Sequence, residues 1–337
     1  MDENTLVTNA LNNYEFSVLG YTKVRSAYKI ESEDCNFCLK KIKHGRNKPE
    51  NGNKLVKELS KVGFNNTAKY YTTKAGNILV KNKKCLFYVT DWIDGTECDL
   101  KIIEEACRCS KLLAQFHRAA NSIENKDFKI RNNIKNWPKI FNSNQYDLDS
   151  FKRKIQRKKL RSEFDKLFYE HIDNFIKRGM IALKILNTSE YYKISKEANK
   201  NKTICHDSFY YQNIIKKDDE FYIIDLDSII FDLQINDLGK LIRRLMYKSE
   251  YGWNFGKAKK IIESYCSVNS LTKSELEVML ALIIYPHKFW KLGKKRYIKC
   301  KSWNESKYVH KIYRLINYDE QQEIFLEEYL KFLDSFS

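Results

Sequence analysis

The sequence predicts an α+β fold, with a small β-rich lobe in residues 1–94 and a large helical lobe in residues 95–337. Three observations support this division. Short apolar runs broken by turns occupy much of the chain up to residue 91. After residue 100, apolar residues recur at steps of three and four, the spacing of a helix face. Between the two patterns lies a turn-rich connector, residues 90–95.

Within the small lobe, residues 36–42 are the clearest predicted strand, and further strands are expected at 78–80 and 85–89. One helix is expected in residues 53–62, because apolar residues recur there at helical spacing and Gly63 follows as a stop signal. This part of the chain therefore predicts a sheet with one helix.

Within the large lobe, helical spacing predicts helices around residues 102–116, 164–186 and 312–332. The residues Thr272 to Glu275 form a capping-box pattern before the apolar run 278–285, which predicts the start of another helix.

Residues 213–225 are the single expected β interruption of the large lobe, because two apolar runs flank an acidic turn. If strand pairing is centred on Asp219, Asn213 faces Asp225, and directly opposed residues have Cβ atoms about 5 Å apart. Amide and carboxylate oxygens suit Mg²⁺, and Asp227 is a third candidate ligand on the same face as Asp225. The alternative is a hairpin with ordinary polar ends.

Composition limits the classes of function. With 61 Lys and Arg against 43 Asp and Glu, the formal net charge is +18, which favours anionic partners over polycationic substrates. The run 278–285 is far shorter than the ~20 apolar residues of a membrane span, and no secretory signal is visible, so we expect cytoplasmic synthesis. The 9 cysteines are dispersed and odd in number, as in proteins of a reducing compartment.

The segment 152–161 is strongly basic, and the apolar residues Phe151, Ile155 and Phe164 suggest an amphipathic helix. A solvated helix face is the first interpretation. Binding to nucleic acid or to an anionic membrane is the weaker alternative, because no aromatic-interleaved motif accompanies the charges.

The segments Cys205–Asn213 and Ile224–Asp227 resemble the catalytic and metal segments of aminoglycoside-phosphotransferase-like kinases. More narrowly, the chain resembles the CotS family of spore coat proteins over roughly residues 15–330. That resemblance implies a protein-kinase-like fold, ATP and Mg²⁺ as cofactors, and a final location in the spore coat among other coat proteins. The residues that carry the narrower resemblance are 88–95, 136–138, 225–238, 285–291 and Trp303.

The resemblance also implies roles for residues of the small lobe. Lys40 matches the strand lysine that holds the phosphates of the nucleotide, although Lys41 could instead be the residue on the cleft side. Glu58 is a candidate partner of Lys40, and the alternative is a helix-surface glutamate paired with Lys54 or Lys61.

Two residues of the connector, Asp91 and Ile93, are candidate nucleotide contacts. Asn213 and Asp225 match the asparagine and aspartate that bind metal in these kinases, so the resemblance and the hairpin argument agree, and Asp227 remains the third candidate.

The sequence departs from the family at the catalytic base. The family pattern is His, any residue, Asp, four residues and Asn, so counting back from Asn213 places Ser208 at the base position, with His206 fixing the loop. A neutral serine is a poor proton acceptor, and a positioned base is typically worth about 10²–10⁴-fold in rate. Asp207 stands one residue early and is a possible rearranged base. The segment 18–24 has one glycine where nucleotide-covering loops often have several.

Three functions follow from these features. The first is a CotS-like coat protein whose kinase fold is catalytically impaired, and which either binds Mg-nucleotide or acts mainly as an assembly scaffold. The second is an active ATP-dependent kinase for a small-molecule or glycan acceptor, with Asp207 as the base. The third and weakest is a module that binds polyanions through its basic face.

Overall fold

The computed structural model describes residues 3–42, 45, 47–83, 85–124, 127–299 and 304–336, which form two structural units. Unit 1 contains the chain up to Asn132 together with Asn201–Asp232, and unit 2 contains Asn133–Lys200 and the chain from Leu233 onward. Trp303, which contributes to the family resemblance, lies outside the described residues. The predicted lobe boundary near residue 94 stays a prediction.

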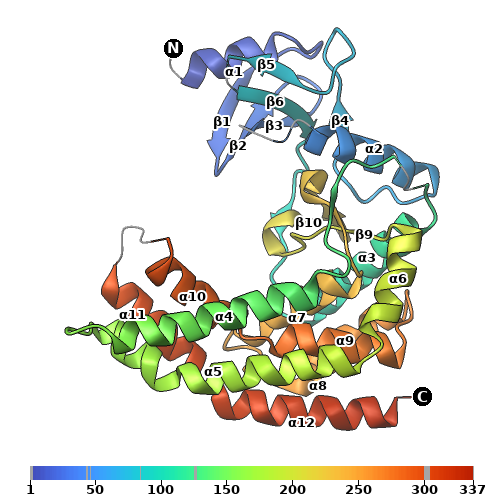
Figure 1. Cartoon of the computed structure of the whole chain (residues 1–337). Helices are drawn as coiled ribbons and strands as arrows, with labels where there is room; N and C mark the ends of the chain where they lie inside the picture. Colours follow the sequence, from blue (N-terminus) through green and yellow to red (C-terminus); the bar gives the residue numbers. More distant parts are fainter. Residues whose placement is uncertain are drawn as a thin grey trace. The chain divides into compact units, whose positions relative to one another are not determined.

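An antiparallel sheet forms the first part of unit 1 (Figure 1). Its strand order is β1-β2-β3-β6-β4, and β5 also pairs with β6. The strands expected at 36–42, 78–80 and 85–89 are confirmed with shifts of a few residues at their ends. The strands are β1 (Gly20–Val24), β2 (Ala27–Glu31), β3 (Asn36–Ile42), β4 (Tyr70–Tyr71), β5 (Val80–Asn82) and β6 (Cys85–Asp91).

Among the described residues, three α-helices lie wholly in unit 1. The first, α1 (Glu3–Leu11), was not expected from the sequence; it lies beside β5, and its residues Val7 and Ala10 are buried in the sheet core. The helix expected at 53–62 is α2 (Asn47–Lys61), which begins earlier than predicted, and the helix expected near 102–116 is α3 (Ile103–Asn121).

Two small three-stranded sheets complete unit 1. One contains the predicted hairpin, β10 (Ile214–Lys217) and β11 (Glu220–Ile223), joined by β7 (Thr96–Glu97). The other contains β8 (Arg131–Asn132), β12 (Ile230–Phe231) and β9 (Ile204–Cys205). The prediction of a single β interruption was therefore wrong, because strands of two residues are too short to show an alternating pattern.

Unit 2 is helical, and α5 packs against both α4 and α9. The capping box at Thr272 and Glu275 is present at the start of α9. The region expected as one helix, 312–332, contains two, which meet at Asn317 and Tyr318. The helices are α4 (Trp137–Gln156), α5 (Glu163–Thr188), α6 (Tyr191–Asn201), α7 (Ile235–Met246), α8 (Phe255–Cys266), α9 (Lys273–Ile284), α10 (His287–Tyr297), α11 (Glu305–Ile316) and α12 (Asp319–Ser335).

The basic segment 152–161 is not one amphipathic helix, because α4 ends at Gln156 and α5 begins at Glu163. Two of its lysines are paired with carboxylates. Lys152 lies 2.6 Å from Asp173, and Lys158 lies 2.6 Å from Asp165. Two of the seven cations in this segment are thus matched by carboxylates within unit 2, so the polyanion interpretation stays a prediction.

An aromatic cluster fixes α10 within unit 2. Phe289 stacks on Phe168 of α5 with ring centroids 4.1 Å apart. Gly293 lets α10 approach this cluster, because a Cβ atom there would lie 2.5 Å from the ring of Phe151 and 2.7 Å from that of Phe168. The position of α10 is therefore set by close packing.

Across the part of the chain that the structure describes, no helix combines the length and the apolar character that a membrane crossing requires.

Candidate functional site

The loop after β9 holds the predicted catalytic residues. His206 is fully buried, and its ring joins two segments of unit 1. The Ser208 N–H donates to Nδ1 of His206 at 3.2 Å, so Nε2 carries the proton and donates to the carbonyl oxygen of Ile224 at 3.0 Å. The imidazole thereby connects the loop to the residue before Asp225, and the role of His206 in the loop geometry of a kinase stays a prediction.

Asp207 adopts the left-handed backbone conformation, with φ of 65°. That conformation is uncommon for any residue other than glycine and turns the side chain away from the path of an extended strand. The carboxylate of Asp207 accepts a hydrogen bond from Arg131 at 3.1 Å. Asp207 is therefore the charge partner of an arginine on β8.

Ser208, which the sequence places at the predicted base position, contributes backbone groups to the loop. Its carbonyl oxygen accepts from Nδ2 of Asn213 at 3.1 Å. Because the amide nitrogen of Asn213 is used in this way, Oδ1 is the atom of that side chain with the chemistry of a cation ligand.

The predicted register of the hairpin was wrong by one residue. Ile214 pairs with Ile223 and Lys217 with Glu220, so the turn contains two residues, with Asp218 at φ of 53°. Asn213 consequently faces Ile224, whose N–H donates to the Asn213 carbonyl oxygen at 3.0 Å, and does not face Asp225. An even turn length was not apparent from the acidic composition of the segment.

Asp225 lies just after the end of β11 and has a left-handed backbone conformation, with φ of 67° and ψ of 43°. Its Oδ1 accepts from Nζ of Lys40 at 2.7 Å, and the Lys40 side chain is only 19% exposed. Lys41 extends towards Glu3 of α1, with 3.8 Å between the charged atoms. Of the two lysines weighed from the sequence, Lys40 is thus the one that meets Asp225.

Asp227 lies in the short 3₁₀ turn η2 (Leu226–Ser228) and accepts a hydrogen bond from the Tyr88 hydroxyl at 2.9 Å. Tyr88 is directly opposite Lys40 in the pairing of β3 with β6, and it stacks on Tyr70 with ring centroids 5.8 Å apart. Lys40 also lies 5.9 Å from the centre of the Tyr88 ring. These contacts bring Lys40, Asp225, Asp227 and Tyr88 into one cluster.

The two carboxylates have opposite pKa shifts. Burial opposes ionisation of Asp225, but the neighbouring Lys40 ammonium outweighs it, so the pKa of Asp225 lies below its usual value. Burial and the charge of Asp225 raise the pKa of Asp227 above its usual value. Burial, together with Asp227, also raises the pKa of Tyr88 well above that of a free tyrosine. The cluster therefore carries a carboxyl group that would be stabilised by an additional cation.

Two site residues were missed from the sequence, Tyr70 and Tyr88. Tyr88 was recognisable in principle, because residues 85–91 form a strand beside the strand of Lys40. Tyr70 lies in a strand of two residues and approaches α2 so closely that the ring occupies the space beside Gly52. No periodic signal marks such a residue.

The remaining predicted cofactor residues lie elsewhere in unit 1. Glu58 accepts from Lys61 at 2.7 Å, which is the surface pair weighed as the alternative to a Lys40 partner. The Asp91 carboxylate accepts from the Tyr71 hydroxyl at 2.7 Å and from the backbone N–H of Lys69, just before β4, at 2.7 Å. A nucleotide contact of Asp91 stays a prediction. Ile93 is partly buried in the connector.

The donor set fits a hard divalent cation. Asp225 and Asp227 offer carboxylate oxygens, and a cation bound beside them would favour the ionised form of Asp227, whose pKa is raised by burial and by Asp225. Asn213 offers Oδ1. The assignment of these residues as metal ligands, and of Lys40 as a phosphate ligand, stays a prediction.

Comparison with known proteins places these observations in a family. A family model described as "Spore coat putative kinase YutH" matches residues 8–329. The chain is 24% identical over 333 residues to spore coat protein S of Bacillus subtilis (strain 168), covering 97% of this chain and 94% of that protein.

Solved structures share the fold. An aminoglycoside phosphotransferase from Alicyclobacillus acidocaldarius matches with a TM-score of 0.85 and 16% identity, over 97% of this chain and 96% of that chain. A spectinomycin phosphotransferase, solved with ADP and spectinomycin, matches with a TM-score of 0.63 and 16% identity, over 96% and 98% of the two chains. The kinase-like α+β fold expected from the sequence is therefore confirmed.

Proposed function

The chain belongs to the spore coat kinase family represented by YutH, and on that premise we propose a coat-associated kinase-fold protein that binds Mg-nucleotide but transfers phosphate poorly. The observation that carries the proposal is the state of the catalytic loop. Ser208 stands at the base position, and the adjacent carboxylate of Asp207 is paired with Arg131. Synthesis in the cytoplasm and a final location in the spore coat belong to the same proposal.

Nucleotide binding is supported by the cluster around Asp225. Lys40 supplies a cation for phosphate oxygens, and Asp225, Asp227 and Asn213 supply oxygen ligands for Mg²⁺. A bound Mg²⁺ would offset phosphate charge. The Lys40–Asp225 pair then has to open, so that the ammonium meets phosphate and the carboxylate meets the metal.

The proposed weak phosphotransfer is explained by Ser208 in the loop after β9. A hydroxyl at position 208 does not accept a proton at neutral pH, and the missing base is typically worth about 10²–10⁴-fold in rate. Much of the remaining catalysis of phosphoryl transfer comes from positioning and electrostatics, so slow turnover rather than complete inactivity is expected.

One observation favours the alternative of an active small-molecule or glycan kinase. The left-handed conformation of Asp207 is the backbone twist that a rearranged base would need in order to leave its extended path. The alternative requires Asp207 to exchange Arg131 for the acceptor hydroxyl.

The nucleotide proposal is tested by thermal unfolding with and without Mg-ATP. Binding at 100 times the dissociation constant stabilises the folded state by about 2.7 kcal/mol, which raises the melting temperature by several degrees. Lys40→Met should lose most of this shift. Lys41→Met is the matched control, because Lys41 is the neighbouring lysine that extends towards Glu3, and it should keep the shift. An unchanged melting temperature in the wild-type protein would leave only the scaffold function.

The two catalytic alternatives are separated by rate measurements of ATP turnover. Under the impaired-base proposal, Ser208→Asp raises the rate and Asp207→Ala has little effect. Under the rearranged-base alternative, Asp207→Ala abolishes the wild-type activity, and Arg131→Met, which releases the Asp207 carboxylate, changes it.

A further inference from the structure

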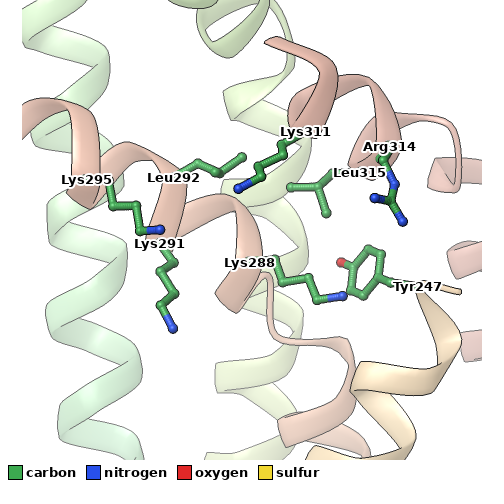
Figure 2. Close-up of a pocket in the computed structure, with 8 residues that line it drawn as sticks. All are labelled: Tyr247, Lys288, Lys291, Leu292, Lys295, Lys311, Arg314 and Leu315. Atoms are coloured by element: carbon green, nitrogen blue, oxygen red, sulfur yellow. The ribbon is translucent and has the colours of Figure 1, made fainter. Parts of the chain in front are cut away.

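Unit 2 contains a cavity of about 330 Å³ between α10, α11 and the end of α7 (Figure 2). Its volume lies at the lower end of the range for small-molecule sites, about 300–1,000 Å³. The apolar lining is buried, whereas the cationic side chains reach the opening to different extents. The lining residues are Tyr247, Lys288, Lys291, Leu292, Lys295, Lys311, Arg314 and Leu315.

The charges of this lining all have the same sign. Lys288, Lys291 and Lys295 follow one another at steps of three and four and so share a face of α10. Lys311 and Arg314 are three residues apart on α11 and extend from the opposite side (Figure 2). Among the described residues, none of these five cations forms an ion pair with a carboxylate.

Such an arrangement opposes folding. Like charges three or four residues apart on a helix destabilise it, and here two such faces converge. Burial and the nearby guanidinium groups of Arg243, Arg314 and Arg244 lower the pKa of Lys288 to about 7. Burial and the charges of Arg243 and Lys291 lower the pKa of the neighbouring His287 to about 3. The electrostatic potential at the cavity is therefore positive, because no carboxylate of the described residues pairs with its five cations.

The inner surface of the cavity is apolar and holds one of the cations in place. The Lys288 ammonium lies 4.0 Å from the centre of the Tyr247 ring, a cation–π contact, and Leu292 and Leu315 are buried beside it. A ligand here would meet cations on two sides and apolar groups beneath.

We propose that this cavity binds a small molecule carrying two or more phosphate groups. Phosphate is dianionic near neutral pH and accepts hydrogen bonds from several donors at once, which suits convergent lysines and an arginine. Two such groups match cations presented from two helices better than one. A concave site of this volume is filled by a compact ligand, whereas an extended acidic chain would use a flat basic surface.

The proposed site is independent of the nucleotide proposal. All of its residues belong to unit 2, whereas Lys40, Asp225 and Asp227 belong to unit 1. Binding here can therefore succeed or fail separately from binding at Lys40.

The test is isothermal titration of the full chain with sodium pyrophosphate at constant ionic strength and with EDTA, which removes divalent metal from the Asp225 cluster. The wild-type protein should bind, and the double variant Lys311→Gln and Arg314→Gln should bind at least tenfold more weakly. The matched control is Lys159→Gln with Lys166→Gln, which removes the same charge from exposed positions of unit 2 and should leave the affinity unchanged.

Three results would overturn the proposal. If the pyrophosphate affinity falls equally in the test and control variants, binding depends on the net charge of the protein and not on the cavity. Loss of binding in Lys40→Met would assign the probe to unit 1. Binding of heparin or polyglutamate that depends on Lys311 and Arg314, without binding of pyrophosphate, would assign the cavity to a macromolecular partner. Retained melting temperatures exclude unfolding as the cause of a lost signal.

Discussion

Substitution of Gly52 by alanine tests the packing beneath the Asp225 cluster. An added Cβ would collide with the hydroxyl oxygen of Tyr70, lie 2.8 Å from Cζ of that ring and lie 3.2 Å from the carbonyl oxygen of Leu226. The ring of Tyr70 is stacked on Tyr88, and the carbonyl oxygen belongs to the turn of Asp227, so neither neighbour moves freely.

The expected magnitude is a balance of two effects. Gly to Ala within a helix ordinarily stabilises by about 1 kcal/mol, whereas overpacking a well-filled site costs about 1–3 kcal/mol. Because the new atom meets contacts on two sides, we expect net destabilisation of about 1–2 kcal/mol. At about 2–4 °C per kcal/mol for a unit of this size, the melting temperature should fall by several degrees.

The assay is thermal and denaturant unfolding of Gly52→Ala in two backgrounds, wild type and Tyr70→Ala. In the second background the colliding ring is absent, so the same substitution should become neutral or stabilising. A destabilisation of equal size in both backgrounds would refute the packing argument, as would a wild-type background in which Gly52→Ala is stabilising. The Mg-ATP shift of the variant provides a second readout, because Tyr70 lies beside Asp227.

Three further predictions concern unit 2. Burial opposes ionisation of Asp165, but hydrogen bonds from Lys158 and Tyr297 place its pKa below the usual value. Asp165→Asn should cost about 2 kcal/mol at pH 7, and its unfolding free energy should approach that of the wild type as the pH falls below about 4, where the pair is lost. Lys288, with a pKa of about 7 when folded, holds fewer protons than in the unfolded chain between pH 7 and about 10, so wild-type stability should rise across that interval. Lys288→Met should stabilise by about 1 kcal/mol at pH 6 and show a smaller gain at pH 10; destabilisation at pH 6 would contradict the electrostatic argument. Thr272→Ala removes the capping box of α9 and should cost about 1 kcal/mol in urea unfolding, with Ser143→Ala, an exposed serine within α4, as the near-neutral control.

Much of the fold was predictable because its periodic elements are long. The strand at 36–42 alternates, and the helices of unit 2 keep an apolar stripe over several turns, so local pattern and tertiary packing agree there. The missed elements include α1, which packs through three apolar residues, the helices α6, α8 and α10, and the strands of two residues, which contain no period to detect.

The candidate site was only partly predictable for a different reason. Lys40 and Asp225 were found through the family resemblance, and their contact joins residues 185 positions apart. The predicted pairing of Asn213 with Asp225 was wrong because it depended on whether the turn contains an odd or an even number of residues. A register shift of one residue moves every side chain to the opposite face of its strand. The Asp207–Arg131 pair could not be anticipated, because it depends on β8 and β9 pairing with the two edges of β12.

The close approach at Gly293 affects how the cationic cavity can respond to a ligand. With no side chain at that position and aromatic rings filling the space, α10 can neither roll nor slide to spread its lysines apart. When the cavity is empty, counter-ions from the solvent and proton loss from Lys288 reduce the repulsion between the cations. An arriving anion replaces the counter-ions while α10 stays in place. Association should accordingly be a single fast phase whose observed rate constant increases in proportion to anion concentration, without the plateau that a preceding rearrangement would impose.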